Sequence, residues 1–314
     1  MYFLAKLFHT NVVTSKNMSS TKSNLLLSFF SILFLIFVLE FASTFITQNV
    51  VNPYSYSAMN WSLFYRQPVN SDGFRGEELE NGEDYLVCFI GDSFTEGDGI
   101  NNFRKRFSNL FEERTNLETF NLGVSNSSTK DQIETLKNMK TVPDVIVWQY
   151  FINDIEGSSA KFGWSLEPSF QYERLIMSSF LINNIFTRIN TLDNPKYSYV
   201  EKLKLYYSNA EIVADHRSDL CKIVEYCSKM DSELFFIVIP YLRNPAQSAF
   251  VSNFMINWLL ENNIPFMDLA EFVEKIPVKQ RVVNKYDPHA SEQLNYIIAE
   301  RLIQELRITG TLSD

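Results

Sequence analysis

A serine stands at the point where a buried strand is expected to end. The apolar segment Tyr85–Ile90 is followed directly by Gly91, Asp92 and Ser93. Open α/β sheets place their ligands at the carboxyl ends of the parallel strands, and a turn into a helix leaves backbone N–H groups free to bind an anion. Ser93 therefore has the position of a nucleophile. Asp92 is expected to cap the turn rather than to take part in chemistry.

Three more segments place polar or small residues after other apolar stretches. Gly123 ends the sequence Asn-Leu-Gly, Asn153 follows the strand expected at Asp144–Tyr150, and Asp287 precedes His289 just before a C-terminal helix. Alone, each is more often a turn glycine, a helix cap or an ordinary histidine than a catalytic residue. Their order after successive strands favours a common site.

The chain offers few histidines for a general base. It has three, of which His9 precedes an apolar N-terminal segment and His216 lies in an expected helix. His289 is therefore the one with a plausible place beside a nucleophile.

Together these four segments resemble the four conserved blocks of the SGNH (GDSL) hydrolase superfamily, over roughly residues 70–308. The segment Asn70–Gly76 resembles the lead-in of a membrane-anchored subgroup. The resemblance implies that Ser93 attacks an ester carbonyl, that His289 takes and returns the proton, and that Asp287 orients His289. It also implies an oxyanion hole made of the Ser93 N–H, the Gly123 N–H and the Asn153 side-chain amide.

The chain departs from the family pattern at two positions. Phe151 stands where the third block usually has glycine, and Asp287 lies two residues before His289 where many members have the acid three before. The Asp-x-His spacing resembles that of polysaccharide O-acetyltransferases. Two alternatives to Asp287 remain open at this point. Asp268 could orient His289 from the end of the strand expected at Ile264–Met267, or a backbone carbonyl could do so.

Composition excludes some classes of function. The 314 residues carry a net charge of −9, which argues against a nucleic-acid backbone as partner. The three cysteines are sparse and odd in number, so no disulfide framework is expected. No metal-ligand spacing and no phosphate-binding loop with a lysine is present, so neither a metal nor a cofactor is expected.

The N-terminal part contains a long apolar run, Leu25–Ile46, interrupted near its outer end by Glu40. This length suits a single transmembrane helix. Lys6, Lys16 and Lys22 precede it, which favours a cytoplasmic N-terminus and a domain on the outer side. A cleaved signal peptide and the buried helix of a soluble protein are the alternatives.

The chain is thus divided into a cytoplasmic segment 1–23, a transmembrane anchor 24–46, a connecting region 47–83 and a catalytic domain 84–314. Strands alternate with helices in the domain, which predicts a doubly wound, flavodoxin-like parallel sheet of about five strands. Residues 156–208 exceed this minimal fold. They form an insertion that is either a lid over the active edge or a helical subdomain with its own core.

The resulting hypothesis is a membrane-anchored serine esterase acting on a small-molecule, glycan or lipid ester. A polysaccharide O-acyltransferase would use the same three catalytic residues. A binding protein that keeps the fold without catalysis is the alternative from another class.

Overall fold

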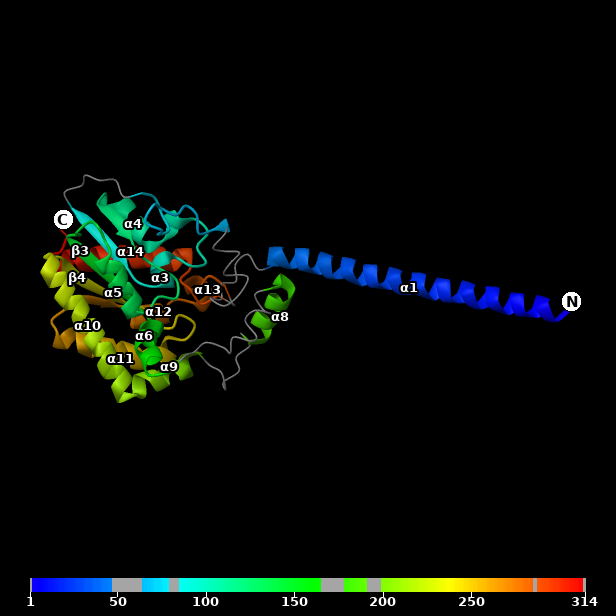
Figure 1. Cartoon of the computed structure of the whole chain (residues 1–314). Coiled ribbons are helices and arrows are strands. Elements are labelled where there is room, and N and C mark those ends of the chain that lie inside the picture. Colours follow the sequence, from blue (N-terminus) through cyan, green and yellow to red (C-terminus); the bar gives the residue numbers. More distant parts are fainter. Residues whose placement is uncertain are drawn as a thin grey trace.

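The computed structural model describes residues 2–46, 64–78, 85–164, 178–190, 199–284 and 287–312. Five parallel strands form one sheet in the order β2-β1-β3-β4-β5 (Figure 1). Their bounds are β1 Leu86–Ile90, β2 Glu118–Asn121, β3 Val145–Tyr150, β4 Glu233–Val238 and β5 Phe266–Asp268. This order confirms the predicted doubly wound sheet. The chain changes direction between β1 and β3, and open sheets bind ligands at the carboxyl end of such a switch point.

Long helices cover both faces of the sheet (Figure 1). Right-handed crossovers place α4 (Phe107–Thr115) and α14 (Glu292–Ile308), which pack together, on one face. The same rule places α5 (Thr129–Lys137), α10 (Ala210–Met230) and α11 (Ala249–Glu261) on the other. Both faces are therefore buried, which is why the strands are almost continuously apolar.

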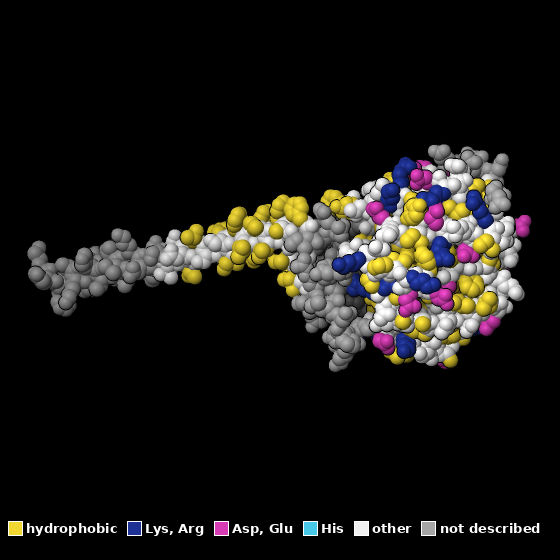
Figure 2. Space-filling model, turned by 180° about the vertical axis from the view of Figure 1, so that it is seen from behind, with side chains coloured by type: hydrophobic (Ala, Val, Ile, Leu, Met, Phe, Trp, Pro, Cys, Tyr) yellow, Lys and Arg dark blue, Asp and Glu magenta, His cyan; other side chains and the backbone are white. Residues whose placement is uncertain are grey.

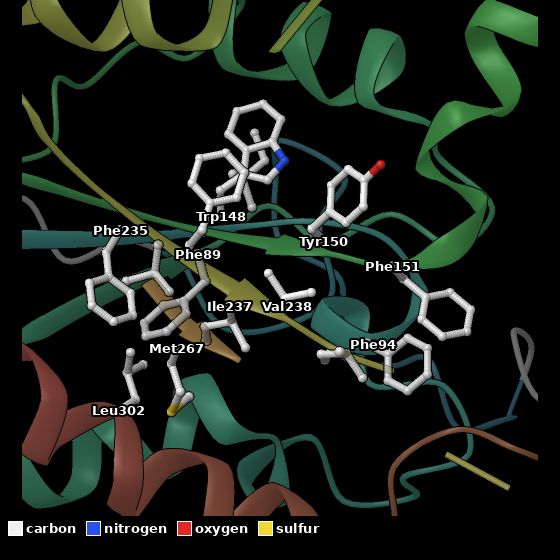
Figure 3. Close-up of a cluster of buried hydrophobic side chains, with 14 of the residues drawn as sticks. Phe89, Phe94, Trp148, Tyr150, Phe151, Phe235, Ile237, Val238, Met267 and Leu302 are labelled. Carbon is white, nitrogen blue, oxygen red and sulfur yellow. The ribbon is translucent and has the colours of Figure 1, made fainter. Parts of the chain in front are cut away.

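Aromatic side chains fill the core on both sides of the sheet (Figure 3). On one side Phe89 of β1 contacts Phe107 of α4 at a ring-centroid distance of 5.7 Å. On the other side Trp148 of β3 stacks on Phe236 of β4, and Phe236 meets Trp258 of α11 edge-on at 6.1 Å. Such pairs add about 0.5–1.5 kcal/mol each beyond the area that they bury. This packing ties β1 to α4 on one face, and β3 and β4 to α11 on the other.

A 3-10 turn precedes α4, and one predicted strand begins later than expected. The turn η1 (Phe103–Lys105) is separate from α4 because Arg106 is extended between them (φ −73°, ψ 152°). The buried Arg106 guanidinium bonds the Phe103 carbonyl at 3.1 Å, which favours this break. The last strand begins at Phe266, two residues later than expected, after the left-handed residue Asn263 (φ 53°).

The N-terminal helix α1 (Tyr2–Ile46) extends away from the domain (Figure 1). Its part Thr21–Phe45 contains an 18-residue stretch with a mean hydropathy of 2.6 and is long and apolar enough to cross a membrane, a test that a signal sequence also passes. None of its most apolar window is buried against the rest of the protein. The alternative of a soluble core helix is therefore wrong.

The remaining elements are shorter and lie mostly in the connections. They are α3 (Ser93–Glu96), η2 (Ile152–Ile155), α6 (Glu156–Lys161), α8 (Phe180–Asn190), α9 (Tyr199–Ser208), η4 (Pro245–Ser248), α12 (Ala270–Glu274) and α13 (Val278–Arg281). Within the insertion, α6 and α9 pack on α10, whereas α8 packs on α1. Residues 165–177 and 191–198 of the insertion, and most of the connecting region, lie outside the described residues, so neither interpretation of the insertion is tested.

Candidate active site

Ser93 is the first residue of α3, directly after the end of β1. Asp92 caps this helix, since its Oδ1 accepts a hydrogen bond from the Phe94 N–H at 3.0 Å. This confirms the role expected for Asp92. Gln149 of β3 also holds the turn, because its Oε1 accepts hydrogen bonds from the Asp92 N–H at 3.1 Å and from the Thr95 hydroxyl at 2.9 Å. The nucleophile position is thereby tied to the neighbouring strand.

His289 lies between Ser93 and Asp287. Its Nε2 is 2.9 Å from Ser93 Oγ, and its Nδ1 is 2.7 Å from Asp287 Oδ1. The same Oδ1 accepts the His289 backbone N–H at 3.0 Å. The fully buried Asp287 is held in turn by its backbone N–H, which donates to Asn284 Oδ1 at 3.0 Å. The structure therefore brings together the three residues that the sequence assigned to proton transfer.

The two candidate acids have different partners. Asp268 lies at the end of β5, and its Oδ1 accepts the Ala270 N–H at 3.1 Å at the start of α12. This bond engages Asp268 with the backbone of α12, whereas Asp287 bonds to His289. A backbone carbonyl is not needed to orient the imidazole either, because Nδ1 is bonded to Asp287.

Asn153 lies in η2, which follows the end of β3 across the switch point from Ser93. Its side chain is close to the carboxyl group of Asp92, the residue before the nucleophile. Burial raises the pKa of Asp92, and the neighbouring amide of Asn153 offsets part of that rise. Asn153 therefore contacts the residue that precedes the nucleophile, and its expected role as an oxyanion donor stays a prediction.

Gly123 packs tightly against α3. A Cβ atom at this position would lie 2.2 Å from the Glu96 nitrogen and 2.5 Å from the Thr95 carbonyl carbon, so no other residue fits. Its N–H donates to Asn121 Oδ1 at 2.9 Å. The N–H would have to leave this bond to bind an oxyanion, so the expected role of Gly123 stays a prediction. In the same loop the exposed Asn126 has left-handed backbone (φ 63°).

Carboxylates dominate the electrostatics around His289. Burial alone would lower the pKa of His289, but the adjacent Asp287 and the more distant Asp98 and Asp92 outweigh it and raise the pKa to about 9. Asp98 is itself buried, and its Oδ1 accepts the Ser125 hydroxyl at 2.5 Å. Burial, assisted by neighbouring carboxylates, raises the pKa of Asp98 to about 7.

Sequence reasoning did not identify Asp98 as part of the site. The available signal was its place between Gly97 and Gly99, both of which have positive φ, only a few residues after the nucleophile. Nothing in that local pattern indicated that this turn lies beside Asp287. The contact is nonetheless close, since a Cβ atom at Gly99 would lie 2.7 Å from Asp287 Oδ2.

Two buried arginines, Arg75 and Arg106, hold the turn that carries Asp98. Arg75 donates to the carbonyls of Gly97 at 2.8 Å and Ile100 at 2.5 Å. Arg106 donates to the Arg75 carbonyl at 2.8 Å. We call these two residues the arginine pair. Arg75 belongs to the segment Asn70–Gly76, so this lead-in fixes the loop that follows the nucleophile.

A row of aromatic rings borders His289. The ring centroid of Phe94 lies 5.2 Å from that of His289 and 4.6 Å from that of Phe151. Figure 3 shows the Phe94 and Phe151 rings side by side. Phe151 thus replaces the usual glycine with a largely buried side chain that packs behind Phe94. Its N–H donates to Asp154 Oδ2 at 2.6 Å, which fixes the backbone that leads to Asn153.

The arrangement has the parts needed for nucleophilic acyl transfer: a hydroxyl, a base within hydrogen-bond distance and an acid that orients the base. Within the described ranges, no group of three His, Cys, Asp or Glu side chains is placed to hold a metal ion.

Of the comparisons with known proteins, only the one with solved structures found similar proteins. No protein-family model matches the sequence, and no curated protein does. Among solved structures, the chain is similar to a lipase/acylhydrolase from Enterococcus faecalis at 14% identity and a TM-score of 0.47, covering 73% of this chain and 97% of that one. A member of the lipolytic protein G-D-S-L family from Veillonella parvula has 14% identity and a TM-score of 0.44, and the match covers 70% of this chain and 96% of that one. A psychrotrophic esterase from a Pseudoalteromonas species has 10% identity and a TM-score of 0.46, and the match covers 73% of this chain and 100% of that one.

Proposed function

We propose that this chain is a serine esterase of the SGNH type that works through an acyl-enzyme on Ser93. The observation that carries the proposal is the continuous hydrogen-bonded path from Ser93 Oγ through His289 to Asp287, at 2.9 Å and 2.7 Å. Both distances are within the range over which a general base can take a proton. A histidine with a purely structural role would not require a serine hydroxyl at the carboxyl end of β1.

The reaction runs in two steps. Ser93 Oγ bonds to the ester carbonyl carbon while its proton passes to His289 Nε2, and the carbonyl oxygen gains negative charge. The Ser93 N–H and the Asn153 amide donate hydrogen bonds to that oxygen. The bond to the alcohol then breaks, and His289 returns the proton to the leaving oxygen.

Water completes the cycle when the activity is hydrolysis. His289 takes a proton from the water as its oxygen attacks the acyl carbon, and the proton returns to Ser93 Oγ when the acid leaves. Asp287 stabilises the imidazolium in both steps without taking the proton itself.

The experiment uses the full-length chain in detergent with a short p-nitrophenyl ester. We expect turnover, and we expect a reactive phosphonate to add the mass of one phosphonyl group to the peptide that contains Ser93. Ser93→Ala should abolish both. Ser127→Ala is the matched control, because Ser127 is also buried close to the end of β1, where its hydroxyl donates to the Gly91 carbonyl at 3.2 Å. Equal turnover by the wild type and Ser93→Ala would refute the proposal.

The acceptor of the acyl group distinguishes two forms of this activity. A sugar hydroxyl in place of water would give O-acyl transfer, and the Asp-x-His spacing shared with polysaccharide O-acetyltransferases favours testing it. An oligosaccharide supplied with an acetyl donor should gain the mass of an acetyl group if transfer occurs. Free acetate as the sole product over a range of acceptors would restrict the activity to hydrolysis of glycan, lipid or small-molecule esters.

The location proposed for the enzyme is the outer side of a membrane, with α1 as the anchor. Support comes from the apolar part Thr21–Phe45 and from the lysines Lys6, Lys16 and Lys22 that precede or begin it. Protease added to intact cells or spheroplasts should digest the domain. Full protection would contradict the outward orientation, and recovery of a mature chain that begins after residue 46 would identify α1 as a signal sequence.

A further inference from the structure

In the first part of α8, residues 180–185, asparagines are buried and isoleucines are exposed, which is the reverse of the pattern of a helix at a water-facing surface. Asn183 and Asn184 are buried, whereas Ile182 and Ile185 are 37% and 51% exposed. The Asn184 amide donates to the Ser43 carbonyl of α1 at 3.1 Å, so the polar side of α8 is the side that faces α1. A surface helix in water does the reverse, with apolar residues inward and amides outward.

Glu40 of α1 caps the N-terminus of α8. Its Oε1 accepts the Phe180 N–H at 2.5 Å, and its Oε2 accepts the Ser179 hydroxyl at 2.6 Å and the Leu181 N–H at 3.2 Å. Free N–H groups at a helix start are strong partners for a carboxylate. This one side chain therefore satisfies several of the donors that would otherwise be left open at the start of α8.

The position of Glu40 along α1 sets the depth at which the two helices meet. Glu40 lies inside the apolar part Thr21–Phe45, five residues before its end. At about 1.5 Å of rise per residue, its Cα is roughly 7–8 Å inside that end. A carboxylate at such a depth is costly unless protein groups pair with it. The groups that pair with Glu40 are those of α8, so the start of α8 has to lie at the same depth.

We propose that α8 is a second membrane-embedded element, which lies against the outer end of α1 with Ile182 and Ile185 in contact with lipid. The inference rests on the proposed membrane anchoring by α1. The surrounding that these isoleucines contact is the bilayer, because α8 packs on α1, where Phe41 and Phe45 in the same stretch as Glu40 and Ser43 are likewise apolar and are 59% and 60% exposed. Figure 2 shows apolar side chains along this part of α1 as it approaches the domain.

The chemistry of the α1–α8 contact agrees with helix packing inside a membrane. Polar side chains there hydrogen-bond between helices, and apolar side chains face the lipid. The Ser43 hydroxyl donates to the Leu39 carbonyl within α1 at 2.7 Å, so it too is satisfied without water. Burial of amides between helices and exposure of isoleucines outside are both explained by a lipid surrounding.

The test places an environment-sensitive fluorophore at Ile185→Cys in the full chain, reconstituted in phospholipid nanodiscs. Cys221, the one exposed cysteine of the three, is first replaced by serine. Phe37→Cys on α1 reports on the anchor, and Glu134→Cys on α5 reports on an exposed position of the domain. We expect the labels at positions 185 and 37 to be blue-shifted and quenched by nitroxide lipids. The label at position 134 should instead be quenched by aqueous iodide.

The outcomes separate this inference from the proposals on which it depends. A label at position 185 that behaves like the one at 134, while position 37 is in lipid, overturns the membrane contact of α8 alone. Labels in water at both 185 and 37 overturn the anchor as well. A blue-shifted label at 185 that nitroxide lipids do not quench, and that changes on dilution with lipid, would indicate a second copy of the chain and would also overturn the inference. Ester turnover, measured in parallel, reports separately on the catalytic proposal.

A second variant tests the Glu40 cap. Glu40→Ala should increase hydrogen exchange at the amides of Phe180 and Leu181 and shift the label at Ile185 towards the red. Glu40→Gln, which keeps one acceptor oxygen, should restore part of both signals. Leu39→Ala is the matched control on the same turn of α1. Unchanged exchange at these amides in Glu40→Ala would show that the cap does not hold α8 in place.

Discussion

The charge state of His289 predicts an alkaline pH optimum. A general base has to be neutral to accept the proton of Ser93, and the pKa of His289 is raised to about 9. Because each pH unit below the pKa lowers the neutral fraction about tenfold, roughly 1% of the enzyme is competent at pH 7 and about half at pH 9. The value of kcat/KM should therefore rise about 50-fold between these two pH values.

Removing the carboxylate of Asp98 should shift the pH dependence of kcat/KM to lower pH. Asp98 helps to raise the pKa of His289, and its own pKa of about 7 means that it is ionised over the range in which His289 titrates. Asp98→Asn removes the charge but keeps an oxygen that can accept the Ser125 hydroxyl. The pKa of His289 should fall, and activity at pH 7 should increase by up to about tenfold for each pKa unit of the shift.

The assay is kcat/KM for a neutral, water-soluble ester from about pH 6 to pH 10, since this parameter reports on the free enzyme. Ser93→Ala supplies the background of spontaneous hydrolysis. Glu134→Gln, which removes an exposed carboxylate on α5, is the control for a general change in charge. A midpoint at or below the ordinary histidine value of about 6.5 would refute the reasoning. A profile that Asp98→Asn moves to higher pH would refute it as well.

Three other substitutions test separate parts of the site. Asn153→Ala should lower kcat by about 10²–10³-fold with little change in KM, because its amide acts on charge that appears during the reaction, and an effect confined to KM would contradict this role. Asp287→Asn should lower kcat by about 10⁴-fold while Asp268→Asn leaves it nearly unchanged, and the opposite ranking in the same ester assay would show that the wrong acid was assigned. Gly99→Ala should displace Asp287, because the new Cβ would lie 2.7 Å from its Oδ2, and should cost about 1–3 kcal/mol of unfolding free energy together with activity. Gly163→Ala is the control, since Gly163 has the same φ of 77° but open space around it. If both variants lose the same unfolding free energy in urea titrations and the same turnover, backbone strain alone would explain the effect of Gly99→Ala.

The residues that the sequence could identify are those whose roles follow from their place along the chain. Ser93 and Asn153 follow strongly apolar strands, and parallel strands bring such positions to one edge of the sheet. His289 can be identified because the chain has few histidines. The sequence does not distinguish Asp287 from Asp268, and the hydrogen bond between Asp287 and His289 Nδ1 favours Asp287. The strand and helix pattern was sufficient for the doubly wound fold.

Other features depend on contacts that no local pattern contains. The Gly123 N–H was expected to be free, but whether Asn121 turns back to bind it depends on the backbone of the loop. Asp98 gains its influence only because its turn folds against the segment that carries Asp287. The sequence predicts that the insertion is a lid or a subdomain. Neither interpretation includes a contact with the N-terminal helix, in which Glu40 caps α8.

The arginine pair has a practical consequence for where the folded unit begins. A chain cut just before β1, at the boundary expected near residue 84, would lack Arg75 and would leave the carbonyls of Gly97 and Ile100 without their buried donors. Arg106 would lose the Arg75 carbonyl as an acceptor at the same time. A truncated enzyme should therefore start upstream of residue 64, and one that starts at 84 should express as a poorly ordered protein even though every catalytic side chain is present.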